Sequence, residues 1–93
     1  MKISMLTATY NREKYLDRLY QSLIINSNYG TDLEWLIMDD GSTDNTKQKV
    51  EEYIANNSID NLEIKYFYQD NQGKMAAINN LIDHVLRRFN NRM

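Results

Sequence analysis

The hydrophobic positions of the chain follow two alternating patterns. Three short apolar runs, at residues 2–8, 33–38 and 62–68, have the length and composition of β-strands. The first two carry apolar residues on both faces, which is typical of strands that are covered on both sides of a sheet. The third alternates apolar residues with Glu63, Lys65 and Phe67. The pattern therefore predicts three strands.

Each predicted strand is followed by a segment with helical periodicity. A polar turn at residues 9–12 precedes the first helix, and Asn11 is placed there to cap it. This helix should end within residues 26–30, where Asn and Gly tolerate left-handed geometry. We expect a second helix over residues 45–57 and a third over 74–89. The expected inner faces are Tyr15, Leu16, Leu19, Tyr20, Leu23 and Ile24; Val50, Tyr53 and Ile54; and Ile78, Leu81, Ile82, Val85, Leu86 and Phe89.

This alternation of strands and helices (β-α-β-α-β-α) predicts a parallel sheet with right-handed crossovers. We expect an α/β fold, a Rossmann-like three-layer α/β/α half-domain with sheet order 3-2-1, formed as one domain by residues 1–93. In such sheets ligands bind beyond the carboxyl ends of the strands. Those ends are polar in this chain, with Thr9-Tyr10-Asn11, Asp39-Asp40-Gly41 and Asp70-Asn71. The sequence therefore predicts a binding site at this edge.

Composition excludes several classes of partner and location. The chain has 11 basic and 13 acidic residues and a net charge of −2, which argues against a nucleic-acid surface. No apolar run reaches the ~18–20 residues of a membrane-spanning helix, so we expect no membrane span in this chain. There are no cysteines, which fits a reducing compartment, and we expect a cytoplasmic location.

Three side chains at the predicted edge can each serve a ligand or only the fold. One carboxylate of the Asp39-Asp40 pair can accept a hydrogen bond from the imide N–H of a pyrimidine, or one can cap the next helix while the other is solvated. The Tyr10 ring can stack on a flat base, or it can fill a gap in the packing. Lys74 begins a helix, where an anion would use both its charge and the free N–H groups, or it can simply face solvent. His84 has no partner ligands nearby in the sequence, and we expect it to be a polar surface residue.

Taken together and in this order, three stretches resemble a known family. They are Thr-Ala-Thr-Tyr-Asn-Arg (7–12), Leu-Ile-Met-Asp-Asp-Gly-Ser-Thr-Asp-Asn-Thr (36–46) and Asn-Gln-Gly-Lys-Met-Ala-Ala-Ile-Asn (71–79). They resemble the N-terminal, nucleotide-binding half of the family 2 glycosyltransferases, which have the GT-A fold. The resemblance covers nearly the whole chain and implies binding of the nucleotide of a UDP-sugar or other NDP-sugar. It further implies inverting transfer of the sugar in polysaccharide or glycoconjugate synthesis.

Carried over to this sequence, the resemblance implies a set of nucleotide-binding residues and no catalytic one. Asp40 matches the carboxylate that meets uracil, with Asp39 as the alternative. Position 8 is Ala where many members have Pro, which leaves a backbone contact there. A Lys at position 74 offers a point charge in place of the fork of an Arg. The implied nucleotide-binding residues are Ala8, Tyr10, Asp40, Lys74, Asp39 and Asn11, with Asn11 and Gly73 as shaping residues.

The family's metal-binding Asp-x-Asp and its catalytic base follow a fourth strand, and no Asp-x-Asp triplet occurs among the 93 residues. The resemblance implies that the parent enzyme uses Mg²⁺ or Mn²⁺ to offset the charge of the leaving diphosphate. We therefore expect this chain to be the nucleotide-binding part of a larger glycosyltransferase, without a metal site of its own and inactive alone.

Other interpretations remain open. The chain could be a non-catalytic α/β interaction module. A receiver-like phosphoacceptor domain needs its acidic pair after the first strand, whereas here the pair follows the second. A dinucleotide-binding Rossmann half needs glycines in its first turn, and residues 9–12 contain none. In the 3-2-1 order the first strand also has a free edge, which predicts a homodimer through that edge.

Overall fold

The computed structural model describes the backbone of residues 2–90 and the side chains of residues 2–87. All three strands are parallel, in the order β1-β2-β3, so β2 lies in the centre of the sheet. The predicted fold class, alternation and strand order are confirmed. The elements are β1 (Lys2–Thr9), α1 (Glu13–Ser27), β2 (Asp32–Asp39), α2 (Thr46–Asn56), β3 (Leu62–Tyr68) and α3 (Lys74–Asn90).

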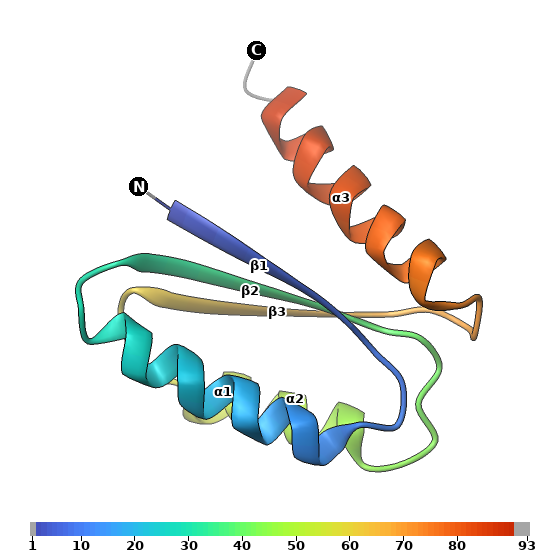
Figure 1. Ribbon diagram of the computed structural model, residues 1–93, viewed down its shortest axis with the longest axis horizontal. Helices are drawn as coiled ribbons and strands as arrows, with labels where there is room; N and C mark the ends of the chain where they lie inside the picture. Colours follow the sequence, from blue (N-terminus) through green and yellow to red (C-terminus); the bar gives the residue numbers. More distant parts are fainter. Residues whose placement is uncertain (1, 91–93) are drawn as a thin grey trace.

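The helices form two layers on opposite faces of the sheet, with α1 and α2 on one side and α3 on the other (Figure 1). Because successive side chains of a strand point to opposite faces, β2 supplies both cores. Trp35 and Ile37 belong to the core under α1 and α2. Leu36 and Met38 belong to the core under α3. The continuous apolar run of the second strand is thus explained by its central, doubly covered position.

The larger core is organised around Trp35, which is fully buried. Its ring stacks with those of Tyr20 and Tyr53, at centroid distances of 6.4 and 6.2 Å. The indole N–H donates a hydrogen bond of 2.9 Å to Oγ1 of Thr7, so the polar end of this large side chain is satisfied inside the core. This contact ties β1 to the central strand close to the predicted edge of the site.

The helix α3 is held to the sheet mainly by Ala77 and Leu81, both fully buried against Leu36 and Met38. Further along the helix, Val85 packs against the same core and His84 lies beside Phe67 of β3, while the C-terminal end of the helix leans away from the sheet (Figure 1). In all three helices, some residues predicted on the inner face are exposed, and that part of the prediction is wrong; Phe89 lies outside the described side chains. The exposed residues and their exposed fractions are Tyr15 51%, Ile54 42%, Ile82 41% and Leu86 55%.

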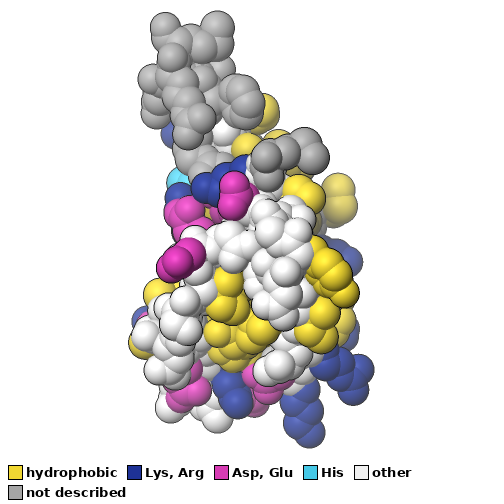
Figure 2. Space-filling view, turned by 90° about the vertical axis from the view of Figure 1, so that its left-hand side faces the viewer, with side chains coloured by type: hydrophobic (Ala, Val, Ile, Leu, Met, Phe, Trp, Pro, Cys, Tyr) yellow, Lys and Arg dark blue, Asp and Glu magenta, His cyan; other side chains and the backbone are white. Residues whose placement is uncertain are grey.

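The outer edge of β1 is unpaired within the part of the chain that the structure describes. Ile3 and Met5 on this strand are exposed, and with Leu23, Tyr29 and Leu33 they line a groove of about 400 Å³. Seen from the end where the strands begin, the surface carries hydrophobic patches between charged side chains (Figure 2). The pairing of two copies through this edge stays a prediction. No helix in the described residues has the length and hydropathy needed to cross a membrane.

The docking of α3 can be tested at Leu81. Leu81→Ala removes a fully buried side chain from the smaller core, and we expect a loss of about 2–5 kcal/mol in the free energy of unfolding. The neighbouring Ile82→Ala is the matched control, because that side chain is partly exposed; its cost should be about 1 kcal/mol or less. Denaturant unfolding of both variants measures the difference. Equal losses would contradict the described orientation of α3.

Candidate functional site

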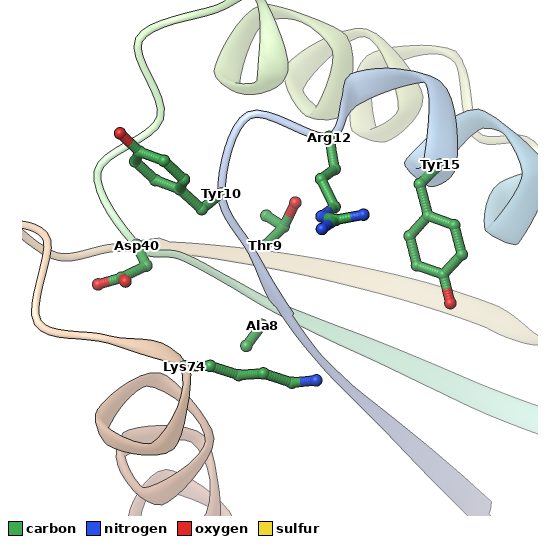
Figure 3. A pocket seen from close by; sticks show the side chains of 7 residues that line it. All are labelled: Ala8, Thr9, Tyr10, Arg12, Tyr15, Asp40 and Lys74. Atoms are coloured by element: carbon green, nitrogen blue, oxygen red, sulfur yellow. The ribbon is translucent and has the colours of Figure 1, made fainter.

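A cavity of about 460 Å³ opens at the carboxyl ends of β1 and β2, between the first turns of α1 and α3 (Figure 3). Four of the residues predicted to bind a nucleotide line it. Two others, Asp39 and Asn11, do not. Four positions that the sequence singled out thus lie on one connected surface. The lining residues are Ala8, Thr9, Tyr10, Arg12, Tyr15, Asp40 and Lys74.

Asp40 follows the last residue of β2, and its carboxylate accepts three hydrogen bonds from the loop that leads into α3. We call these three hydrogen bonds the clasp. Its Oδ1 accepts hydrogen bonds from the Gln69 side-chain amide at 2.9 Å and from the backbone N–H of Gln72 at 2.7 Å. Its Oδ2 accepts one from the backbone N–H of Gly73 at 2.9 Å. Since each carboxylate oxygen has two lone pairs, Oδ2 can take one more donor. The clasp also places Lys74, the next residue along the chain, on the wall of the cavity.

These hydrogen bonds lower the pKa of Asp40 below its ordinary value of 3.8. The Gln69 amide is the largest cause and the Gln72 N–H the next, while burial acts in the opposite direction and the Gly73 N–H adds to the lowering. All three donors favour the charged carboxylate over the protonated acid. The side chain therefore presents a stable negative charge over the physiological pH range.

The loop can approach Asp40 closely because Gly41 has no side chain. Gly41 has a φ of 85°, and a Cβ placed on it would lie 2.9 Å from the backbone nitrogen of Asn71. Any other residue would be strained at this φ and would also push against the loop. The Asp-Asp-Gly sequence thus combines the acceptor with the space that its donors need.

The Asp39 side chain lies on the opposite face of the sheet from that of Asp40, because adjacent residues along a strand point to opposite faces. It is fully buried and accepts hydrogen bonds from the backbone N–H of Ser42 at 2.8 Å and from the Tyr66 hydroxyl at 2.6 Å. Burial, and then this hydrogen bond to Asp39, raise the pKa of Tyr66. Asp39 supports the turn after β2 and ties it to β3, and it does not line the cavity.

Asn11 joins the loops after β1 and β2. Its backbone is left-handed, with a φ of 52°, and its N–H donates to Oγ of Ser42 at 2.9 Å. Its Oδ1 accepts from the backbone N–H groups of Thr43 at 2.8 Å and Asp44 at 3.2 Å. The prediction that Asn11 caps the first helix is wrong: Arg12 is the N-cap and makes no side-chain cap bond. The oxygen of Asn11 instead serves the N–H groups of the neighbouring loop.

Three lining residues were missed by the sequence reasoning: Thr9, Arg12 and Tyr15. The spacing of Arg12 and Tyr15 offered a signal, because residues three apart lie on the same side of a helix. Tyr10 and Tyr15 are 44% and 51% exposed, so the cavity has an aromatic ring toward each end in Figure 3. Arg12 and Lys74 are exposed cations and have neither an ion pair nor a side-chain hydrogen bond among the described residues.

Within residues 2–90, no three His, Cys, Asp or Glu side chains come together as a metal site. Asp40 is the single carboxylate on the cavity wall, and its oxygens already hold the loop. His84 lies partly buried beside Phe67, with ring centroids 4.7 Å apart. The residues present therefore do not form a cage for the Mg²⁺ or Mn²⁺ that the family resemblance implies.

The low pKa of Asp40 predicts that its clasp is sensitive to acid. Because the pKa in the folded chain is below the unfolded value, the stabilisation is complete above about pH 4 and is lost as the pH falls through the folded-state pKa. We expect the amide resonances of Gln72 and Gly73 to shift over this range, together with a fall in stability. Asp40→Asn should reduce this acid-dependent loss. Asp70→Asn, in the same loop, is the control; an equal effect of the two variants would contradict the clasp.

The loop junction at Asn11 can be tested by three substitutions. Asn11→Ala removes the acceptor of two backbone N–H groups. It also leaves an alanine at a left-handed φ, which Asn tolerates better because its side chain can form local hydrogen bonds. We expect a loss of about 1–3 kcal/mol in the free energy of unfolding. Asn11→Asp keeps the acceptor and should cost less, and Asn11→Gly relieves only the backbone. Thermal and denaturant unfolding would contradict this assignment if the alanine variant were as stable as wild type.

Residues 4–89 match the sequence model described as glycosyl transferase family 2. The chain is 34% identical over 79 residues to an uncharacterised glycosyltransferase of Mycoplasma genitalium, covering 85% of this chain and 26% of that protein. It is 37% identical over 75 residues to validoxylamine A glucosyltransferase of Streptomyces hygroscopicus subsp. limoneus, covering 81% of this chain and 16% of that protein.

A shorter match, 45% identical over 53 residues, covers 57% of this chain and 9% of the poly(ribitol-phosphate) beta-N-acetylglucosaminyltransferase TarS of Staphylococcus aureus. No solved structure gives a significant match. The chain spans about a quarter of the length of the first relatives, at 26%, 25% and 23%. Since the family match covers nearly the whole chain, with the three quoted stretches inside or beside the cavity, the chain belongs to glycosyltransferase family 2.

Proposed function

We propose that this chain is the donor-binding part of a glycosyltransferase, and that its cavity binds the nucleotide of a UDP-sugar or other NDP-sugar. The observation that carries the proposal is the convergence of Tyr10, Asp40 and Lys74 on one cavity. These residues come from three separate segments of the chain. Their side chains suit three different parts of a nucleotide: the face of the base, its imide N–H and the diphosphate. The family membership supports the same function.

Each of the three side chains has a chemical role in this proposal. The exposed ring of Tyr10 offers a face on which a base can stack, a contact worth roughly 1–3 kcal/mol. The remaining acceptor position on Oδ2 of Asp40 suits the imide N–H of uracil. The ammonium group of Lys74 has no described partner and suits the negative charge of a diphosphate. Ala8 contributes a small side chain and backbone beside the base.

The rest of the reaction belongs to the proposal only in outline. Inverting transfer, a Mg²⁺ or Mn²⁺ ion, a cytoplasmic location and inactivity of the chain alone stay predictions. Two relatives are named for different acceptors, one for validoxylamine A and one for poly(ribitol-phosphate). The acceptor of this chain, in polysaccharide or glycoconjugate synthesis, is therefore not inferred from them. No step is assigned to a metal ion, since residues 2–90 form no ligand cluster for one.

Calorimetric titration with UDP tests the proposal. We expect wild-type chain to bind, and Tyr10→Ala to weaken binding about tenfold or more through the loss of stacking. Lys74→Gln should weaken UDP binding more than uridine binding, because only UDP carries the diphosphate. Both side chains are exposed and lack described hydrogen bonds, so neither variant should perturb folding.

Tyr29→Ala is the matched control, because Tyr29 is 81% exposed and lines the groove beside the edge of β1 instead of this cavity. Binding that is weakened equally by all three variants would count against the cavity. No heat of binding even at millimolar UDP would favour the second candidate function, a non-catalytic α/β interaction module.

A further inference from the structure

We propose that Arg12, together with the hydroxyl of Thr9, forms the phosphate-binding part of the cavity, facing Lys74 across it. This assignment rests on the proposed function, because it names the part of the ligand that these residues would hold. It is carried by two separate observations. The first is that the Arg12 guanidinium on the cavity wall has no ion pair or hydrogen bond among the described residues. The second is that the buried Thr9 hydroxyl has no hydrogen-bond partner among them.

The backbone of Arg12 is fixed while its side chain is free. Its carbonyl oxygen accepts hydrogen bonds from the N–H groups of Tyr15 at 3.0 Å and Leu16 at 3.1 Å, so the residue is anchored as the N-cap of α1. The guanidinium has no ion pair or hydrogen bond among the described residues. A side chain that leaves a fixed point and carries five unused donors is well placed to capture an anion with bidentate geometry.

The nearest competing use of Arg12 is an ion pair with Asp44. The two residues line a second cavity, of about 440 Å³, yet no ion pair joins them. One carboxylate oxygen of Asp44 instead accepts hydrogen bonds from the backbone N–H and the hydroxyl of Thr46, at 3.0 and 2.6 Å, at the start of α2. The Asp44 carboxylate is thus engaged locally, and Arg12 remains available.

The charges in the cavity are separated. In Figure 3 the Asp40 carboxylate turns toward the loop before α3 and lies on the same side as Tyr10. Arg12 extends from α1 on the other side, and Lys74 extends its ammonium group in that direction from α3. One end of the cavity thus offers the Tyr10 ring and a carboxylate acceptor, and the other offers two cations beside the Tyr15 ring. This order matches a base at one end of the ligand and a chain of phosphates at the other.

Thr9 supplies the second observation. Its residue is 4% exposed, and its Oγ1 is the one buried side-chain polar atom that lacks a hydrogen bond within the described part of the chain. A buried hydroxyl without a partner destabilises the ligand-free chain, because the group has lost its hydrogen bonds to water and gained none in return. Thr9 lines the same cavity and lies between Tyr10 and Arg12 in Figure 3. A phosphate oxygen held by the Arg12 guanidinium beside Thr9 would supply the missing acceptor.

The assignment of Arg12 is tested by titrating uridine, UMP, UDP and inorganic pyrophosphate into wild type and Arg12→Gln. We expect the variant to bind UDP and pyrophosphate about tenfold more weakly and uridine as well as wild type does, with an intermediate loss for UMP. Arg18→Gln makes the same change of charge on the same helix outside the cavity, and should leave all four affinities unchanged. Unchanged UDP affinity in Arg12→Gln, or an equal loss for uridine, would overturn the assignment.

The contribution of Thr9 is tested by Thr9→Val, which replaces the unpartnered hydroxyl by a methyl group of similar size. We expect the variant to be at least as stable as wild type and to bind UDP about threefold more weakly. Unchanged UDP affinity would remove Thr9 from the subsite. If wild type binds pyrophosphate in an Arg12-dependent way but not UDP, the proposed function is wrong and the anion site remains. If wild type binds neither, both are overturned.

Discussion

The geometry of the candidate site depends on the hydrogen bonds that the Asp40 carboxylate accepts from the loop before α3. These bonds join the residue after the central strand to the two residues that directly precede α3. The bonds to Gln72 and Gly73 fix where α3 begins, and the burial of Leu81 fixes how it lies on the sheet. The position of Lys74 follows from these two constraints.

The adjacent carboxylates of Asp39 and Asp40, at the end of the central strand, bind different parts of the fold. The alternation of a strand sends Asp39 into the layer of α1 and α2, where Tyr66 and Ser42 satisfy it. Asp40 faces the other layer and keeps one acceptor position for a ligand. Asn11 completes the arrangement by linking the loops after β1 and β2. The loops around the cavity are therefore fixed by hydrogen bonds of Asp39, Asp40 and Asn11. Of these three residues, Asp40 alone lines the cavity.

Period and length were sufficient to predict the fold, because a centrally placed strand such as β2 must be apolar on both faces. The same reasoning failed where an apolar helix position has no neighbouring element to cover it, as at Ile82 and Leu86, which are exposed although Leu81 and Val85 beside them pack against the sheet. It failed again at Asn11, whose role as a link between loops requires knowledge of which loops are neighbours. Arg12 and Thr9 were missed for the same reason, since a missing partner is a property of the folded chain.

The central claim is that one cavity at the carboxyl ends of the strands binds the nucleotide. The most direct measurement is the change in backbone amide chemical shifts of isotope-labelled chain on addition of UDP. We expect the largest changes at residues 8–12, 40 and 72–75, which are far apart in sequence and share the cavity or its hydrogen bonds. Changes centred on Ile3, Met5 and Tyr29, or none at saturating UDP, would contradict the account.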